Sequence, residues 1–162
     1  MTGDESNIDT LVSHLEAEEA CLTEMVRLLE DEADALRHMR HAELAGYSES
    51  KLAVAETHQA LVCQRNACIA TIAPSETRPH NLTDVRRVLG DEGDTLAGNQ
   101  RRLRALCDRV GRLRAHNMAL ADMGRRRVDE SLRALRARRN PVYRGDGRLH
   151  AQTPAQRGRG RV

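Results

Sequence analysis

Pairs of histidine and acidic residues are the features of this 162-residue chain whose spacing could support metal binding. His14 stands four residues before Glu18, and His38 stands three residues before His41, so each pair would share one face of a helix. A di-iron site in a helix bundle needs Glu-x-x-His sequences on two helices with further inward carboxylates, and no Glu-x-x-His occurs in the chain. We interpret these histidines as surface residues and expect no metal, no cofactor and no enzymatic activity.

The cysteines and glycines also lack the spacing that chemistry would require. Cys63 and Cys68 are separated by four residues, rather than the two of a zinc or redox pair. Cys21 and Cys107 are isolated, and cysteines within helices usually behave as small buried hydrophobic residues. Glycines at 90, 93 and 98 follow no predicted strand and are followed by no lysine, unlike a phosphate-binding loop. Reduced cysteines, a polar start and the lack of a long apolar run predict a cytoplasmic protein without membrane insertion.

Charge is distributed unevenly along the chain. Residues 1–50 contain thirteen acidic and three basic residues, a net charge of −10, whereas residues 81–140 contain fifteen arginines and eight acidic residues, a net charge of +7. Opposite charges would attract an early helix to a late helix and set their orientation, although they could also serve only solubility. The arginines could instead contact nucleic-acid phosphates. Phe and Trp are absent for base stacking and the acidic segment would repel a polyanion, so we expect no nucleic acid partner.

The apolar pattern predicts an all-α fold, an elongated antiparallel three-helix coiled-coil-like bundle with a disordered C-terminal tail. Without Phe and Trp, the core must be thin and built from aliphatic side chains, which suits packing between helices. Prolines at 74, 79, 141 and 154 leave two long stretches free of helix breakers. We predict a domain over residues 1–140, with helices at about 7–44, 50–72 and 82–139, and a flexible Arg-rich tail over 141–162.

A heptad repeat in the first predicted helix defines the seam along which it packs. Its leading positions are Ile8, Leu15, Leu22, Leu29 and Leu36. Glu18 and Glu32 interrupt the seam, which predicts either an open seam or polar partners. In the last helix, Asn99 and Asn117 fall on seam positions. We expect Gly46 to end the first helix and the glycines at 90–98 to break or kink the last one.

Four short segments resemble the FlgN family of flagellar export chaperones: Glu49–Ala53, Leu113–Leu120, Val128–Leu135 and Val142–Gly147. The resemblance implies a chaperone that keeps hook-filament junction proteins unassembled and brings them to the cytoplasmic domain of the flagellar type III export gate. It also implies that Tyr143, followed by a Gly-Asp-Gly turn, docks the chaperone onto that gate, with Arg144 beside it. A coiled-coil scaffold or adaptor protein without an export role remains the alternative.

The end of the last helix is the predicted client-binding site. After Met123 the apolar stripe shifts by one residue, in a stretch that the shorter second helix is not expected to cover. Internal packing of this stripe is the alternative. The predicted client-binding residues are Leu120, Met123, Val128, Leu132 and Leu135.

Overall fold

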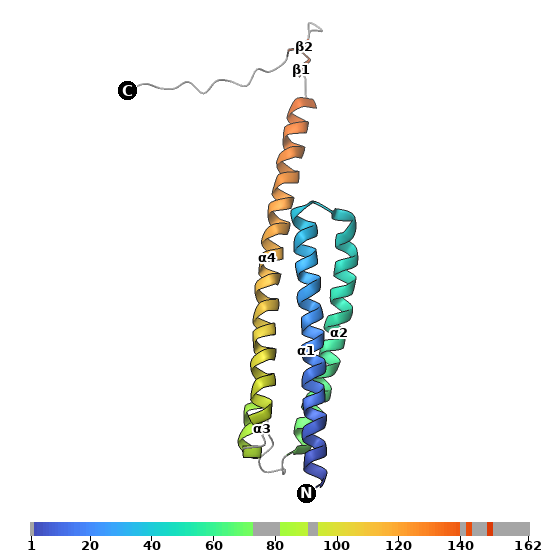
Figure 1. Cartoon of the computed structure of the whole chain (residues 1–162). Helices are drawn as coiled ribbons and strands as arrows, with labels where there is room; N and C mark the ends of the chain where they lie inside the picture. The colour runs from blue at the N-terminus through green and yellow to red at the C-terminus, as the bar shows by residue number, and fades with distance from the viewer. Residues whose placement is uncertain (1, 73–81, 91–93, 140–141, 144–148, 151–162) are drawn as a thin grey trace, which may run out of the picture. The chain divides into compact units, whose positions relative to one another are not determined.

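The described residues form four helices and two very short strands. The computed structural model describes the backbone of residues 2–72, 82–90, 94–139, 142–143 and 149–150. In chain order the elements are α1 (Thr2–Arg37), α2 (His41–Ile72), α3 (Leu82–Leu89), α4 (Asp94–Arg139), β1 (Val142–Tyr143) and β2 (Leu149–His150) (Figure 1). They form two compact units, Met1–Ala121 and Asp122–Val162. The predicted helical-bundle class is confirmed.

The turn between the first two helices lies earlier than the sequence predicted. α1 ends at Arg37, and Gly46 lies inside α2 rather than at the end of a helix. Met39 adopts a left-handed backbone conformation with φ 56°, while its N–H donates to the Leu36 carbonyl at 3.4 Å and the Arg40 N–H donates to the Ala35 carbonyl at 2.9 Å. These two bonds form a Schellman motif, in which glycine usually occupies the left-handed position. Because methionine rather than glycine occupies that position, the turn could not be predicted from the sequence.

The predicted third helix is divided into α3 and α4. α3 ends at Leu89, and Gly90 follows it with φ 57°, a conformation that glycine adopts without steric cost. α4 then begins at Asp94, and Gly98 lies inside it. The expected break is therefore present at the start of the glycine-containing stretch, while residues 91–93 lie outside the described part of the chain.

Hydrogen bonds between helices give their directions in the first unit. Cys68 Sγ contacts the Asn7 carbonyl and Cys21 Sγ the Val54 carbonyl, so positions rise along α1 as they fall along α2. From α1 to α4 the order is preserved, because Glu19 pairs with Arg102 and Glu30 with Arg109. α1 is therefore antiparallel to α2 and parallel to α4, and it lies between them (Figure 1).

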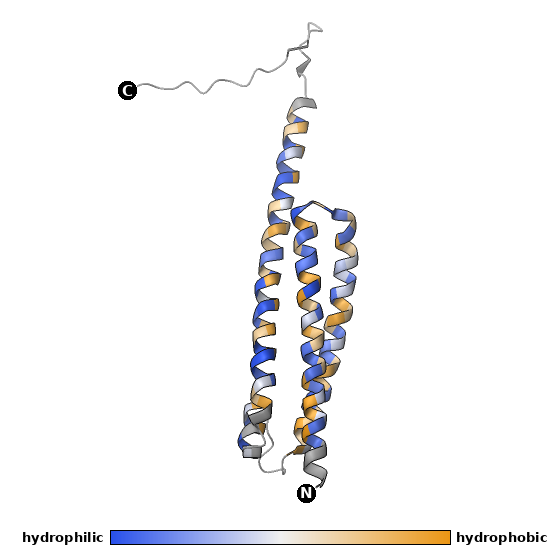
Figure 2. Ribbon diagram, viewed as in Figure 1, coloured by the Kyte–Doolittle hydropathy of each residue, from blue (hydrophilic) through white to orange (hydrophobic). Residues whose placement is uncertain are grey.

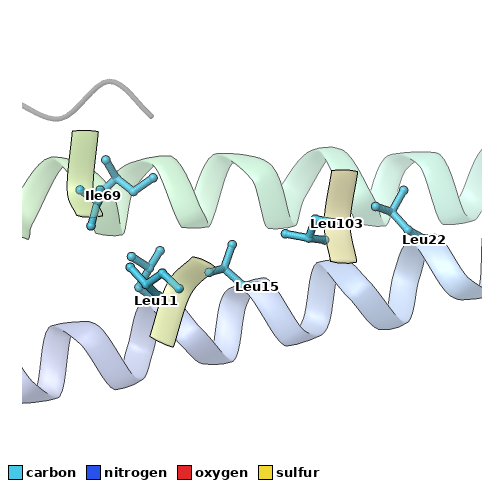
Figure 3. Packing of buried hydrophobic residues seen from close by; sticks show 7 residues of the cluster. Leu11, Leu15, Leu22, Ile69 and Leu103 are labelled. Atoms are coloured by element: carbon cyan, nitrogen blue, oxygen red, sulfur yellow. The ribbon is translucent and has the colours of Figure 1, made fainter. Parts of the chain in front are cut away.

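The core of the first unit is aliphatic and follows α1. Leu11, Leu15 and Leu22 face Ile69 of α2 and Leu103 of α4 in Figure 3, and Val85 of α3 and Leu96 of α4 complete the buried cluster. Hydrophobic residues recur at helical intervals along α1 and α4 in Figure 2. Seam leucines thus pack as the heptad repeat predicted. Leu28 and Ala35 are also buried, so α1 is covered on more than one side.

The second unit contains the end of α4 and the strand pair. β1 and β2 are antiparallel, with Val142 opposite His150 and Tyr143 opposite Leu149. No strand was expected in this segment from its sequence. The rest of the predicted tail, residues 141, 144–148 and 151–162, lies outside the described residues, as does residue 140.

Candidate functional site: the apolar stripe at the end of α4

Four of the five predicted client-binding side chains are large, apolar and exposed. The exposed fractions are 51% for Met123, 46% for Val128, 44% for Leu132 and 57% for Leu135. Leu120 is half-buried and belongs to the first unit. Internal packing of this stripe stays the alternative to client binding. Client binding by the five residues stays a prediction.

Three of the exposed residues share one face of α4. Val128, Leu132 and Leu135 follow the i, i+4, i+7 spacing that places side chains on a single helix face. We call these three residues the late stripe. Met123 precedes Val128 by five residues and therefore lies off that face. The five predicted residues are thus a three-residue stripe with Leu120 and Met123 apart from it.

Arginines border the late stripe. Given about 100° of turn per residue, Arg125 and Arg136 lie along one edge of the stripe and Arg127 lies along the other, whereas Arg126 and Arg133 lie on the opposite face. All five are exposed. Arg125 Nη2 is 3.3 Å from Asp122 Oδ1, an exposed pair within the helix. From the sequence, Arg125, Arg126 and Arg127 were weighed as contacts for nucleic-acid phosphates or as a face that pairs with the first helix, and not as the border of an apolar stripe.

Earlier along α4, arginines at the edge of the seam contact acidic residues of α1. Arg102 Nε donates to both carboxylate oxygens of Glu19 at 2.9 Å, and Arg109 Nη2 donates to Glu30 Oε1 at 2.6 Å. These contacts confirm the predicted attraction between the acidic first helix and the basic last helix. Exposed pairs of this kind contribute up to about 1 kcal/mol each, so they select a partner and its orientation more than they stabilise the bundle.

A polar cluster joins three helices in the first unit. Glu32 of α1 accepts from Lys51 Nζ of α2 at 2.6 Å and from Asn117 Nδ2 of α4 at 2.8 Å, and Asn117 also donates to the Leu29 carbonyl at 2.8 Å. We call Glu32, Lys51 and Asn117 the polar node. Lys51 and Asn117 come from two different segments of the family resemblance, and the fold brings them to one carboxylate. A buried seam asparagine fixes the register between helices.

The other seam glutamate also has a polar partner. Glu18 is 2% exposed, and its Oε2 accepts from Arg65 Nη1 of α2 at 2.7 Å. Burial raises the pKa of the Glu18 carboxyl above its usual range, although Arg65, His58 and His14 oppose the shift. Both glutamates that interrupt the seam therefore face basic residues of α2, which decides between the open seam and the polar seam.

The histidines and cysteines weighed as metal ligands are dispersed. His38 lies in the turn after α1, and its Nδ1 is 2.9 Å from the carbonyl of Asp34 in the last turns of α1. Cys21, Cys63, Cys68 and Cys107 are free thiols. Across the described part of the chain, no group of three or more His, Cys, Asp or Glu side chains could hold a metal ion. None of the described helices is long and apolar enough to cross a membrane.

The predicted gate-docking residues lie in the second unit. The backbone of Tyr143 forms β1 and pairs with Leu149 of β2. Arg144 lies outside the described residues, as does the Gly-Asp-Gly sequence at 145–147. Docking by Tyr143 and Arg144 stays a prediction.

Comparison with known proteins identifies one family. The family model described as "FlgN protein" matches residues 1–151, which include the bundle, the late stripe and the strand pair. No curated protein and no solved structure matches the chain significantly.

Proposed function

Because the chain belongs to the FlgN family of flagellar export chaperones, we propose that it binds hook-filament junction proteins in the cytoplasm and delivers them to the export gate. The observation that carries the proposal is the late stripe. Its three residues are 44–57% exposed, although each is large and apolar. An apolar helix face left open to this extent favours a protein-binding role.

The binding mode that suits the late stripe is the packing of a second amphipathic helix against it. Residues at i, i+4 and i+7 on a helix form the contact surface used when one helix lies in the groove of another. An apolar, coiled-coil-forming end of a junction protein would aggregate or assemble early if it stayed free in the cytoplasm. Covering that end with a chaperone helix would prevent both.

The size of the late stripe fits a client that must be released. Fully burying a leucine or valine side chain contributes about 1.5–3 kcal/mol, so each half-exposed residue of the stripe would add about 1 kcal/mol on binding. Association itself costs at least about 4 kcal/mol in lost freedom. Three such residues give a modest contribution, and the client must supply further contacts to bind stably.

A double aspartate substitution in the late stripe tests client binding. Leu132→Asp with Leu135→Asp should abolish binding of a purified junction protein, because two charges would be placed in the contact surface. Ala134→Asp with Ala137→Asp is the matched control, since both alanines are exposed in the same turns of α4 and lie off the stripe. Binding is measured by calorimetry, and helicity by circular dichroism. Unchanged client affinity in the leucine variant would reject the site, as would loss of helicity.

We further propose that Tyr143 and Arg144 dock the loaded chaperone onto the cytoplasmic domain of the export gate. The support is the family resemblance, in which a tyrosine after the last helix performs this role. Aromatic side chains often dominate small interfaces, and an arginine can speed encounter with an acidic surface. Tyr143→Ala should keep client affinity and weaken calorimetric binding of the chaperone-client complex to the isolated gate domain. Unchanged gate affinity would refute the role, and lost client binding would move Tyr143 to the client site.

A further inference from the structure

The two halves of α4 have similar composition. Residues 94–121 contain six arginines and two acidic residues, and residues 122–139 contain seven arginines and three acidic residues, so each half has a net charge of +4. Each half also has an apolar face at helical spacing. The apolar residues Leu96 and Leu103 are buried in the first half, whereas Val128, Leu132 and Leu135 are exposed in the second.

The helix that covers the first half of α4 is strongly acidic. α1 contains eleven acidic residues and two arginines over Thr2–Arg37, a net charge of −9. Its carboxylates meet arginines that stand directly before seam residues: Glu19 meets Arg102, which precedes Leu103, and Glu30 meets Arg109, which precedes Val110. In the first half, the apolar seam bordered by arginines therefore packs against an acidic helix.

The second half repeats the local arrangement with its apolar residues exposed. Arg127 stands directly before Val128, as Arg102 stands before Leu103, and Arg125 and Arg136 line the other edge of the late stripe. From this repetition we infer that the client segment is an amphipathic helix whose apolar stripe is bordered by Asp and Glu. This inference rests on the proposed client binding and specifies its selectivity: the late stripe takes acidic-bordered helices and rejects basic-bordered ones.

Two synthetic peptides test the selectivity on the full-length chain. Both have leucine at heptad positions a and d; one has glutamate at positions e and g, and the other has lysine there. Because each exposed ion pair adds little and a few act together, we expect the glutamate peptide to bind about tenfold more tightly at low ionic strength. The advantage should shrink as salt is added, because salt screens exposed charges.

Matched arginine variants separate the edges of the stripe from general charge. Arg127→Glu with Arg136→Glu reverses two border charges, and Arg126→Glu with Arg133→Glu makes the same change in net charge on the opposite face. We expect the border variant to lose or invert the preference for the glutamate peptide and the opposite-face variant to retain it. Equal effects of the two variants would overturn the inference, because the attraction would then depend only on net charge.

A scrambled peptide and the leucine variant distinguish the remaining outcomes. A scrambled glutamate peptide of the same composition should not bind, and equal binding would also overturn the inference. If both leucine peptides bind equally and Leu132→Asp with Leu135→Asp abolishes both, the client site stands and the charge selectivity is wrong. If the aspartate variant has no effect on the junction protein, the proposed function fails at this site. Sedimentation showing that the late stripe pairs two copies of the chain would reject the client as its occupant.

Discussion

The first and second halves of α4 are similar in composition but differ in how far their apolar faces are buried. Both are arginine-rich, both have an apolar face, and each has a net charge of +4. In the first half α1 packs over Leu103 of that face and over the polar Asn117, and both are buried, whereas every described side chain from 125 to 137 is exposed. An apolar repeat on a helix therefore predicts a contact surface and leaves open whether the partner is the same chain or another protein.

The largest expected effect comes from making the same substitution in both halves. Leu103→Ala should lower the free energy of unfolding by about 3 kcal/mol, because Leu103 is 6% exposed within the aliphatic core. Leu132→Ala should change it by less than about 0.5 kcal/mol, because Leu132 already contacts water, and should instead weaken client binding. Urea unfolding followed by circular dichroism measures the first quantity, and calorimetry with the junction protein the second.

If those two results are exchanged, the two halves of α4 have the opposite roles. A large loss of stability in Leu132→Ala would assign the late stripe to the core. A stable Leu103→Ala protein with weakened client binding would move the client site into the bundle.

Periodicity and charge predicted the bundle, the seam leucines and the attraction between α1 and α4, because each depends on a pattern repeated over many residues. The first turn was missed because its left-handed position holds Met39, and a single residue that breaks the glycine preference leaves no pattern. The polar node was also missed. Glu32, Lys51 and Asn117 are far apart in sequence, and only the parallel and antiparallel pairing of three helices brings them together. The late stripe was predicted by spacing, but Met123 was assigned to it although it lies on another face.

The polar node should contribute the second largest effect. Glu32→Ala removes the carboxylate that Lys51 and Asn117 share. The side-chain amide of Asn117, which is only 6% exposed, then loses one hydrogen-bond partner. We expect a loss of about 2 kcal/mol in the free energy of unfolding. Glu30→Ala is the matched control, because its pair with Arg109 is exposed on both sides and should contribute less than about 1 kcal/mol. Equal losses in urea unfolding would show that the node does not hold α4 against its neighbours.

Substitutions at the left-handed positions Met39 and Gly90 should change the free energy of unfolding in opposite directions. Met39→Gly should raise the free energy of unfolding by about 0.5–1 kcal/mol, since a side chain at φ 56° is strained and glycine is not. Gly90→Ala should lower it by about 1 kcal/mol at φ 57°, where an added Cβ meets no atom within 4 Å and the cost is therefore conformational. Client affinity should stay unchanged in both, because neither turn contains the late stripe. Thermal unfolding and client calorimetry measure the two quantities, and a stabilised Gly90→Ala protein would contradict the strain argument.

The smallest effect concerns the buried acid of α1, the helix that covers the first half of α4. Burial raises the pKa of Glu18 above its ordinary value of 4.5, despite the opposing charges of Arg65, His58 and His14. The folded protein therefore binds the Glu18 proton more tightly than the unfolded chain does, and this residue's contribution to stability falls as pH rises from about 4.5 through the folded pKa. Glu18→Gln imitates the protonated form, so the wild type should lose stability relative to the variant over that rise. Urea unfolding of both proteins at several pH values measures the difference, in which titrations common to both cancel. Arg65→Met should widen the pH dependence, because it removes the nearest charge that favours the carboxylate. If the wild type instead becomes more stable relative to Glu18→Gln as pH rises, the charge of Arg65 outweighs the effect of burial. The ion pair between Glu18 and Arg65 would then itself stabilise α1.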